Sequence, residues 1–327
     1  MRMARVFVGL VAPGSSQMKR LLLGMASVGL CLSTGGQAKA DYTFRYPIDP
    51  PGSIRTETQG INTRGDIVGF YEDADHIVHG FLLIGEEFTS FDVPVSGTTW
   101  TQGSGINDSR DIVGRYIAGG QQHGYLRHID DTYELLDDPP EGHSPQPYAI
   151  NNSSDIVGNF FDETDGITRG FLLSGGKYTK IAPPGSTFAL AQGINRFGLI
   201  VGVYELDGRR HGFVRLSGGR FIYPPDYPPD RERASRLTSN VGINDPGQIS
   251  GSFIDADGVR HGFVNEYGQY TTIDPPGGIT VFASGINASG WIVGPYTEAA
   301  TGIIHGYLAR PVPEPGPGAA SNRLGLR

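Results

Sequence analysis

Six copies of one pattern follow each other along the chain. Each copy has a Gly-Ile-Asn or Ala-Ile-Asn triplet, then an Ile-x-Gly triplet, then a His-Gly-aromatic or Arg-Gly-aromatic triplet. A repeat of about 40 to 50 residues is typical of solenoids, propellers and arrays, so the period constrains the architecture before any single residue does. The anchor asparagines, 43 to 49 residues apart, are Asn62, Asn107, Asn151, Asn195, Asn244 and Asn287.

The segments within one repeat are short, rich in β-branched and aromatic residues, and separated by turn residues. In the second copy they cover residues 99–107, 111–117, 123–128 and 132–136. Segments of this kind are typical of strands and not of helices. Four strands joined by short turns predict a four-stranded antiparallel meander, which is the unit of a β-propeller blade.

The two ends of the chain each carry part of a repeat. Residues 41–59 match the second half of the pattern, and the last copy stops after His305-Gly306-Tyr307-Leu308. Pairing of these ends within one blade would close a ring and remove two open sheet edges. We therefore expect an all-β fold over residues 41–310, a six-bladed β-propeller. Three strands from the C-terminus and one from the N-terminus would complete its last blade.

The first forty residues have the features of a secretory signal peptide. Met18-Lys19-Arg20 supplies a positive start, residues 21–32 are apolar, and Ala38-Lys39-Ala40 is a small-residue cleavage site. This order of features is typical of export signals. We expect residues 1–17 to be an over-extended start and residues 18–40 to be the signal. Cleavage near Ala40 would release a secreted protein, periplasmic or extracellular.

Loss of that signal changes the composition of the mature chain. The single cysteine, Cys31, leaves with it, so no disulfide can stabilise the mature domain. Five basic residues leave as well, which changes the formal net charge from −8 to −13. An acidic surface argues against nucleic acid as a partner. No later segment is apolar and long enough to be expected to span a membrane, and the sequence leaves the oligomeric state open.

The repeat pattern resembles the HAF-type extracellular repeats of exported bacterial proteins, which are named for a His-Ala-Phe triplet. The resemblance covers nearly all of residues 42–310, with glycine in place of the alanine, as in His79-Gly80-Phe81. It implies an exported location and a repeat architecture. It implies no activity and no catalytic residue.

Residues 311–327 form a tail rich in proline and glycine. Its opening, Pro311-Val312-Pro313-Glu314-Pro315, resembles that of bacterial PEP-CTERM sorting signals. Such signals continue into an apolar helix and a basic cluster, whereas residues 316–327 contain no apolar run. The sequence therefore favours a terminal linker, and a truncated sorting signal is the alternative.

Most of the histidines occupy one position of the repeat, where they could be mistaken for metal ligands. Equivalent positions in different blades are distributed around a ring, whereas a zinc or iron ion needs three or four ligands close together. We expect each histidine to bond a backbone or polar group of its own blade, with Arg169 as the donor in one copy. These structural histidines are His79, His123, His211, His261 and His305.

Acidic hairpin turns suggest calcium. The best candidate is the turn that contains Asp255 and Asp257, which resembles the oxygen-rich start of a calcium loop. Calcium takes six to eight oxygen ligands, and each such turn supplies two carboxylates. A solvated Asp-Gly turn is the alternative. We expect no other cofactor.

One insertion breaks the repeat, at residues 224–236. It contains Tyr227, Asp230, Arg231 and Arg233, a set in which tyrosine can stack on a sugar and arginine can bind a carboxylate. These four residues are the candidate ligand-binding residues, and a cheaply tolerated surface insertion is the alternative. No spacing of nucleophile, base and orienting acid is evident, so no catalytic residue is predicted.

These features favour a secreted, non-catalytic binding or scaffold module at the bacterial cell surface or in the matrix. Its partner would be an extracellular polysaccharide or a surface protein. One alternative is a propeller hydrolase or lyase that acts on an extracellular polysaccharide. Another is a matrix protein that binds copies of itself. Fold alone does not decide among them.

Overall fold

The structure is a computed structural model that describes residues 42–224 and 238–312. All of these residues belong to the second of two compact units into which the chain divides, Ala38–Arg327. The described residues form strands and turns without a helix. Accordingly, no helix of the described part has the length and apolar character needed to cross a membrane. The predicted signal peptide lies outside these residues.

The strands form four-stranded antiparallel units, and each unit is named here after its anchor asparagine. The Asn62 unit contains β2 (Arg55–Ile61), β3 (Ile67–Glu72), β4 (Val78–Ile84) and β5 (Glu87–Phe91). The Asn107 unit contains β6 (Thr98–Ile106), β7 (Ile112–Ala118), β8 (Gln121–Arg127) and β9 (Tyr133–Leu135). The Asn151 unit contains β10 (Gly142–Ile150), β11 (Ile156–Asp162), β12 (Ile167–Ser174) and β13 (Lys177–Ile181).

The remaining units follow in chain order. The Asn195 unit contains β14 (Phe188–Ile194), β15 (Ile200–Leu206), β16 (Arg209–Arg215) and β17 (Phe221–Ile222). The Asn244 unit contains β18 (Thr238–Ile243), β19 (Ile249–Ile254), β20 (Arg260–Glu266) and β21 (Gln269–Ile273). The Asn287 unit contains β22 (Gly278–Val281), β23 (Gly285–Ile286), β24 (Ile292–Glu298), β25 (Ile304–Pro311) and β1 (Tyr42–Ile48).

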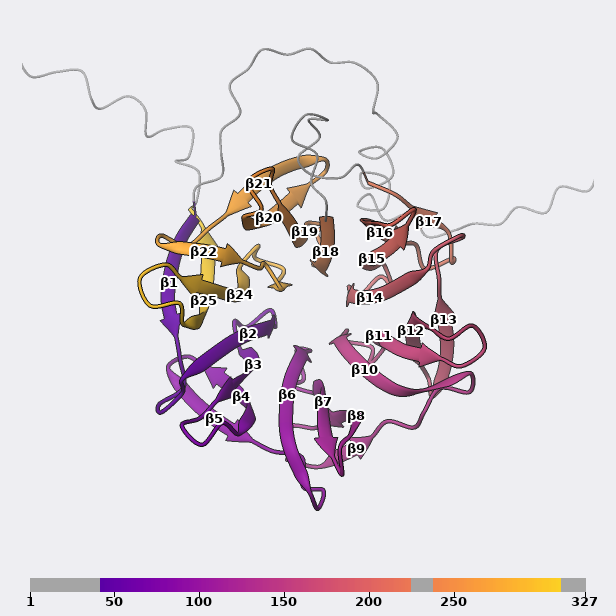
Figure 1. The fold of residues 1–327 in the computed structure, drawn as a ribbon, viewed down its shortest axis with the longest axis horizontal. Coiled ribbons are helices and arrows are strands. Elements are labelled where there is room, and N and C mark those ends of the chain that lie inside the picture. Colours follow the sequence, from indigo (N-terminus) through magenta and orange to yellow (C-terminus); the bar gives the residue numbers. More distant parts are fainter. Residues whose placement is uncertain (1–41, 225–237, 313–327) are drawn as a thin grey trace, which may run out of the picture. The chain divides into compact units, whose positions relative to one another are not determined.

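The units lie around one axis, with β2, β6, β10, β14 and β18 nearest to it (Figure 1). The all-β class and the four-stranded antiparallel units predicted from the repeat are confirmed. In the Asn107 unit the predicted strand limits differ from the observed ones by at most two residues. The Asn287 unit combines both ends of the chain, because β1 pairs antiparallel with β25, from Tyr42 opposite Pro311 to Ile48 opposite Gly306.

The anchor asparagines join neighbouring units at one end of the axis. Within its own turn, Asn62 accepts hydrogen bonds at Oδ1 from the backbone N–H groups of Arg64 and Asp66, both at 3.0 Å. Its Nδ2 donates to the backbone carbonyl of Asn107 at 3.3 Å. Each anchor repeats this bond to the next one, and Asn287 donates to the carbonyl of Asn62 at 3.0 Å, which closes the ring. Each of these asparagines thus has a structural role: it holds its own turn and bonds to the next unit.

Glycines before these anchors allow the inner strands to approach each other closely. A Cβ on Gly60 would lie 2.9 Å from the carbonyl oxygen of Ser104 and 3.1 Å from the Cα of Gly105. A Cβ on Gly285 would lie 2.8 Å from the carbonyl oxygen of Gln59. Real Cβ atoms do not tolerate such contacts, and only a residue without a side chain fits there without a shift. Neighbouring inner strands are therefore tightly packed against each other at the asparagine end.

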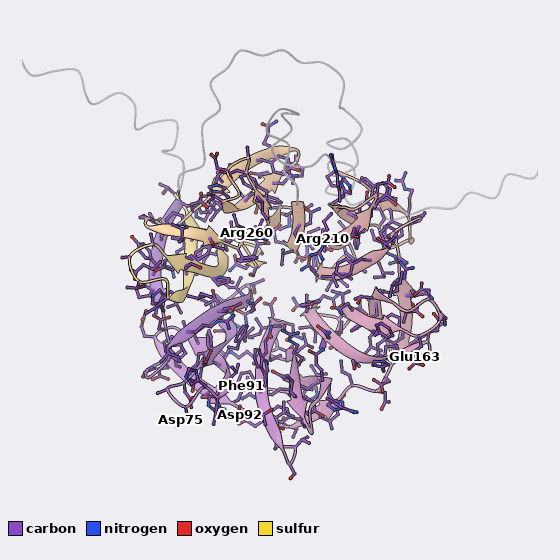
Figure 2. All side chains as sticks on the ribbon, in the orientation of Figure 1. Asp75, Phe91, Asp92, Glu163, Arg210 and Arg260 are labelled. Atoms are coloured by element: carbon purple, nitrogen blue, oxygen red, sulfur yellow. The ribbon has the colours of Figure 1, made fainter. Side chains whose placement is uncertain are left out.

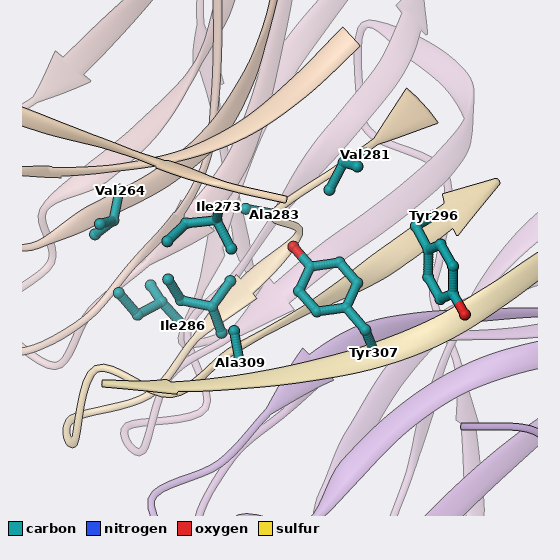
Figure 3. Packing of buried hydrophobic residues seen from close by; sticks show 9 residues of the cluster. Val264, Ile273, Val281, Ala283, Ile286, Tyr296, Tyr307 and Ala309 are labelled. Atoms are coloured by element: carbon teal, nitrogen blue, oxygen red, sulfur yellow. The ribbon is translucent and has the colours of Figure 1, made fainter. Parts of the chain in front are cut away.

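The hydrophobic core lies between consecutive units. Val264 and Ile273 of the Asn244 unit pack on Val281, Ile286 and other residues of the Asn287 unit (Figure 3). The aromatic residue of each His-Gly-aromatic or Arg-Gly-aromatic triplet is fully buried, because it fills the space between the sheets. These residues are Phe81, Tyr125, Phe171, Phe213, Phe263 and Tyr307.

Candidate functional site

Two cavities occupy the axis of the ring. One, of about 130 Å³, lies at the asparagine end and is lined by the anchor triplets. The other, of about 320 Å³, lies at the opposite end of the inner strands; it is called the cup here. Its volume falls at the lower end of the range for small-molecule sites. The two cavities share one layer, the floor of the cup, formed by Gln59, Ser104, Tyr148, Gln192, Val241 and Ser284.

The floor residues all stand three positions before an anchor asparagine. Because side chains alternate along a strand, this position faces the axis in every unit. Part of the wall of the cup comes from residues two positions before the floor residues, as in Glu57 and Phe282. The rest comes from second and third strands of the Asn195 and Asn244 units and from the second strand of the Asn287 unit. All units thus contribute to one cavity, but not equally.

Two arginines from neighbouring units reach this cavity, Arg210 on β16 and Arg260 on β20. Figure 2 labels both arginines, on the side of the centre where Figure 1 shows β18. The guanidinium of Arg210 lies 4.7 Å from the ring centre of Phe188, and that of Arg260 lies 4.6 Å from the ring centre of Phe282. Stacking on an aromatic face holds a guanidinium in place and leaves its N–H edge available for other partners.

Few of the N–H donors of these two arginines have hydrogen-bond partners in the described residues. Arg260 donates from Nη1 to the hydroxyl of Ser252 at 3.0 Å. Among the described residues it has no ion pair with a carboxylate, whereas Arg210 has one longer contact, from Nε to Glu205 at 3.6 Å. Burial lowers the pKa of Arg260, and the charge of Arg210 lowers it further. Each guanidinium has five N–H donors, so most of this donor capacity is available to a ligand.

Arg115 shows how an arginine looks when the protein itself satisfies it. This side chain of β7 donates to the amide oxygens of Gln102, Gln122 and Gln146 at 2.9 to 3.2 Å. Arg260 has one such bond within the described chain. The comparison indicates that the arginine pair, unlike Arg115, is not saturated by the fold.

The arginine pair also breaks the repeat. Each arginine stands immediately before the histidine of its triplet, at His211 and His261. The equivalent residues elsewhere are Val78, Gln122, Thr168 and Ile304. A single site on a repeat protein needs residues that other copies lack. Our sequence analysis missed the pair, and alignment of the six copies column by column would have revealed it.

Glu57 is the one carboxylate that lines the cup among the described residues. It is already engaged, since it forms an ion pair with Arg55 and accepts a hydrogen bond from Nε2 of Gln59 at 3.1 Å. With two arginines and one glutamate, the lining has a formal charge of +1. The protein as a whole carries −8. The local charge therefore opposes the overall charge and favours an anion in the cup.

Tyr148 adds a hydrogen-bonding group to the floor, whereas the hydroxyl of Ser104 is buried beneath the cavity surface and has no hydrogen-bond partner within the described residues. Burial raises the pKa of Tyr148, and the charge of Arg115 opposes this shift. Its phenol is therefore protonated at neutral pH and able to donate.

The repeated histidines are not among the residues that line the cup, and each packs against an aromatic residue of the second strand of its unit. His261 is bracketed by two carboxylates: Nδ1 lies 2.7 Å from Asp274 and Nε2 lies 3.2 Å from Asp255. His79 has the same arrangement with Asp92, which Figure 2 labels, and Asp73. The geometry is that of a local brace that ties two loops of one unit together.

This brace predicts a pH-dependent contribution to stability. Burial alone would lower the pKa of His261, but Asp274 and Asp255 outweigh burial and raise it above 6.5. The stabilisation is complete below the unfolded pKa and is lost as pH rises through the folded pKa. We expect His261→Gln to lower the melting temperature more at pH 5.5 than at pH 8.5. The control is His76→Gln, since this exposed histidine contacts one carboxylate, that of Glu72, and its replacement should change the melting temperature less. An equal loss at both pH values would contradict the brace.

The carboxylate of Asp255, in the turn predicted to bind calcium, is engaged by other groups of the protein. The Oδ1 atom of Asp255 accepts backbone hydrogen bonds from Asp257 and Val259 at 3.0 and 2.8 Å, and Oδ2 contacts His261. The side chain of Asp257 is exposed. Within residues 42–224 and 238–312, no group of three or more His, Cys, Asp or Glu side chains is arranged to hold a metal ion. The candidate ligand-binding residues Tyr227, Asp230, Arg231 and Arg233 lie outside the described residues.

Comparisons with known proteins concern the fold alone. The sequence matches no protein-family model and no curated protein sequence. Among solved structures, AofleA from Arthrobotrys oligospora has 14% identity and a TM-score of 0.50 over 85% of this chain and 88% of its own. The β-propeller domain of the trilobed protease from Pyrococcus furiosus has 10% identity and a TM-score of 0.46, with 78% and 95% covered.

Another similar structure is that of a catalytically inactive virginiamycin B lyase from Staphylococcus aureus with quinupristin. It has 10% identity and a TM-score of 0.43, with 82% of this chain and 88% of that chain covered. At such identities, likeness extends to architecture and not to activity. The units of antiparallel strands around an axis define the class of protein: this chain is a β-propeller.

Proposed function

We propose that this chain is an exported six-bladed β-propeller that binds an anionic ligand in its cup without turnover. Each four-stranded unit is one blade, and the bond from Asn287 to Asn62 together with the pairing of β1 and β25 supports closure of the ring. The observation that carries the proposal is that Arg210 and Arg260 line the axial cavity with most of their N–H donors unpaired within the described residues. An acidic extracellular polysaccharide is the ligand class that fits an exported protein of this kind.

The lining of the cup favours binding over hydrolysis. Glycoside hydrolases generally use two carboxylic groups, one as acid and one as base or nucleophile. Among the described lining residues, Glu57 alone has a carboxylate, and Arg55 and Gln59 hold it. Tyr148 is a poor candidate for a general base, because burial raises its pKa and a base works best with a pKa near the working pH. A hydrolase or lyase remains the alternative that a turnover assay tests.

A glycan array with the exported form of the full chain tests this function. We expect binding to acidic polysaccharides both with calcium and with a chelator, because the arginines need no metal. We also expect no shortening of the bound chains. The variant Ser284→Phe adds a large side chain to the floor and should abolish binding. Ser289→Phe, at an exposed position of the Asn287 turn, is the matched control.

The other outcomes each have a meaning. Retained binding by a folded Ser284→Phe variant would place the ligand elsewhere and refute the cup. Binding that disappears with the chelator would favour the Asp-Gly turns as metal sites. Release of new chain ends would establish an enzyme. Assembly that depends on concentration, with no glycan bound, would favour a matrix protein that binds copies of itself.

A further inference from the structure

We propose that Arg210 and Arg260 form one subsite that takes the carboxylate of an acidic sugar residue in the cup. This inference rests on the proposed binding function and specifies its ligand. The two side chains come from neighbouring units and line the same cavity. Guanidinium groups bind carboxylates through paired N–H donors in a planar fork, which is a strong and directional contact.

The position of the pair is better explained by a ligand than by the fold. Two like charges in one half-buried cavity repel each other, and an anion between them removes that cost. Both side chains line the same cavity, and burial, then the charge of Arg210, lower the pKa of Arg260. Phe188 and Phe282 cover the flat faces of the guanidinium groups. The N–H edges, which recognise oxyanions, are left for a ligand.

The floor of the cup is neutral and polar. Its residues include Gln59, Tyr148 and Gln192. Near the arginines, the hydroxyl of Ser239 donates to the amide oxygen of Gln192 at 3.1 Å. Hydroxyl and amide groups of this kind bind the hydroxyls of a sugar. The cup therefore combines an anion-binding wall with a neutral polar floor.

The charge balance favours a singly charged group. The carboxylate of the lining, Glu57, is paired with Arg55, and Nε of Arg210 lies 3.6 Å from Glu205. Among the described residues Arg260 has no carboxylate partner, which leaves one uncompensated positive charge in the lining. A sugar carboxylate carries one negative charge and presents its two oxygens in one plane, as the guanidinium fork requires. A sulfate ester also carries one charge but is tetrahedral. The experiment therefore compares these two anions directly.

The test uses the full exported chain with three probes: an oligogalacturonate, the same oligosaccharide with its carboxyl groups reduced, and a sulfated oligosaccharide of equal length. Titration calorimetry measures each affinity at low and high salt. We expect the oligogalacturonate to bind best and to weaken with salt. We expect Arg260→Gln and Arg210→Gln each to weaken its binding by about tenfold to a hundredfold, as for loss of hydrogen bonds to a charged group.

Control variants separate the subsite from general effects. Arg45→Gln removes an arginine of β1 that pairs with Glu86 outside the cup, and it should bind as the unmodified protein does. Arg260→Lys keeps the charge but loses the fork, so it should recover only part of the affinity. Melting temperatures of all variants show that they are folded.

Several results would overturn the subsite. They are equal binding of the carboxyl-reduced probe, a preference for the sulfated probe, no binding of any probe, and normal affinity in both glutamine variants. If the glutamine variants bind normally but Ser284→Phe does not, the cup binds its ligand without the arginine pair. If Ser284→Phe also binds normally, the cup is not the binding site. The failure of this inference is thus distinguishable from that of the proposed function.

Discussion

Deletion of residues 41–53 is expected to unfold most of the protein at 37 °C or to lower its melting temperature by more than 10 °C. The deletion removes β1, and with it the pairing to β25 and the buried side chain of Ile48, which is 1% exposed. It also removes Asp49, which contacts Nδ1 of His305 at 2.7 Å. A buried isoleucine alone contributes about 1.5 to 3 kcal/mol, and whole domains are stable by about 5 to 15 kcal/mol.

The same deletion should produce self-association, because β25 would become an exposed sheet edge that can pair with another chain. Differential scanning calorimetry and light scattering after gel filtration measure the two effects. Two single substitutions test the same contact without removing the strand. Ile48→Ala should be clearly destabilising, whereas Ile54→Ala, at a position that is 41% exposed, should have little effect. An unchanged melting temperature after the deletion would show that the terminal strands do not hold the ring together.

The sequence was sufficient to predict what depends on short-range pattern. The strands of the Asn107 unit and the anchor turns follow from alternation and turn residues. The pairing of residues 42–48 with the end of the chain is a long-range contact, but the incomplete repeats at the two ends indicate it. The strand and turn patterns repeat six times, so noise in one copy does not obscure them. Gly251 illustrates this, since its triplet departs from Ile-Val-Gly at Ser250 but keeps the glycine.

The candidate site was not predicted. Alignment of the copies would have shown Arg210 and Arg260 at one repeat position, but no local motif indicates that they line one cavity. Arg210 and Arg260 are fifty residues apart, and no local spacing connects them. What brings them together is the rotation from one unit to the next, which places equivalent strands around the axis. The residues that interrupt the repeat most visibly, such as Tyr227 and Arg231, attracted attention instead. Single substitutions within the repeat carried the more useful information.

Arg169 shows that such substitutions can be interpreted physically. In the Asn244 and Asn287 units a loop aspartate, Asp274 or Asp49, binds the histidine of the triplet. In the Asn151 unit the equivalent residue is Ala182, and the histidine is replaced by Arg169. Arg169 instead donates to Asp165 at 2.6 Å and to a backbone carbonyl of the same loop, that of Ser186, at 2.8 Å. The aspartate is thus absent at position 182, and the longer side chain of Arg169 reaches the carbonyl of Ser186 instead.

The glycine of the Ile-x-Gly triplet is expected to be the least replaceable small residue of the repeat. A Cβ on Gly114 would lie 1.9 Å from the carbonyl oxygen of Gln102 and 2.7 Å from the hydroxyl of Tyr125. That hydroxyl donates to the same carbonyl at 3.0 Å. In every unit the equivalent Cβ would lie 1.8 to 2.1 Å from a backbone carbonyl oxygen of the inner strand, at Gly69, Gly114, Gly158, Gly202, Gly251 and Gly294.

Gly114→Ala should therefore destabilise the protein by about 3 kcal/mol or more. The added Cβ would displace the backbone carbonyl of Gln102 and also break the hydrogen bond that Tyr125 donates to it. The control is Gly120→Ala, where φ is +79° and nothing lies within 4 Å of the added Cβ. It should cost only the strain of a left-handed residue, about 1 to 2 kcal/mol. Chemical denaturation measures both free energies. Equal losses in the two variants would mean that β7 can move away from β6 at little cost, and the close approach of Gly114 to Gln102 would then not explain why glycine occurs there.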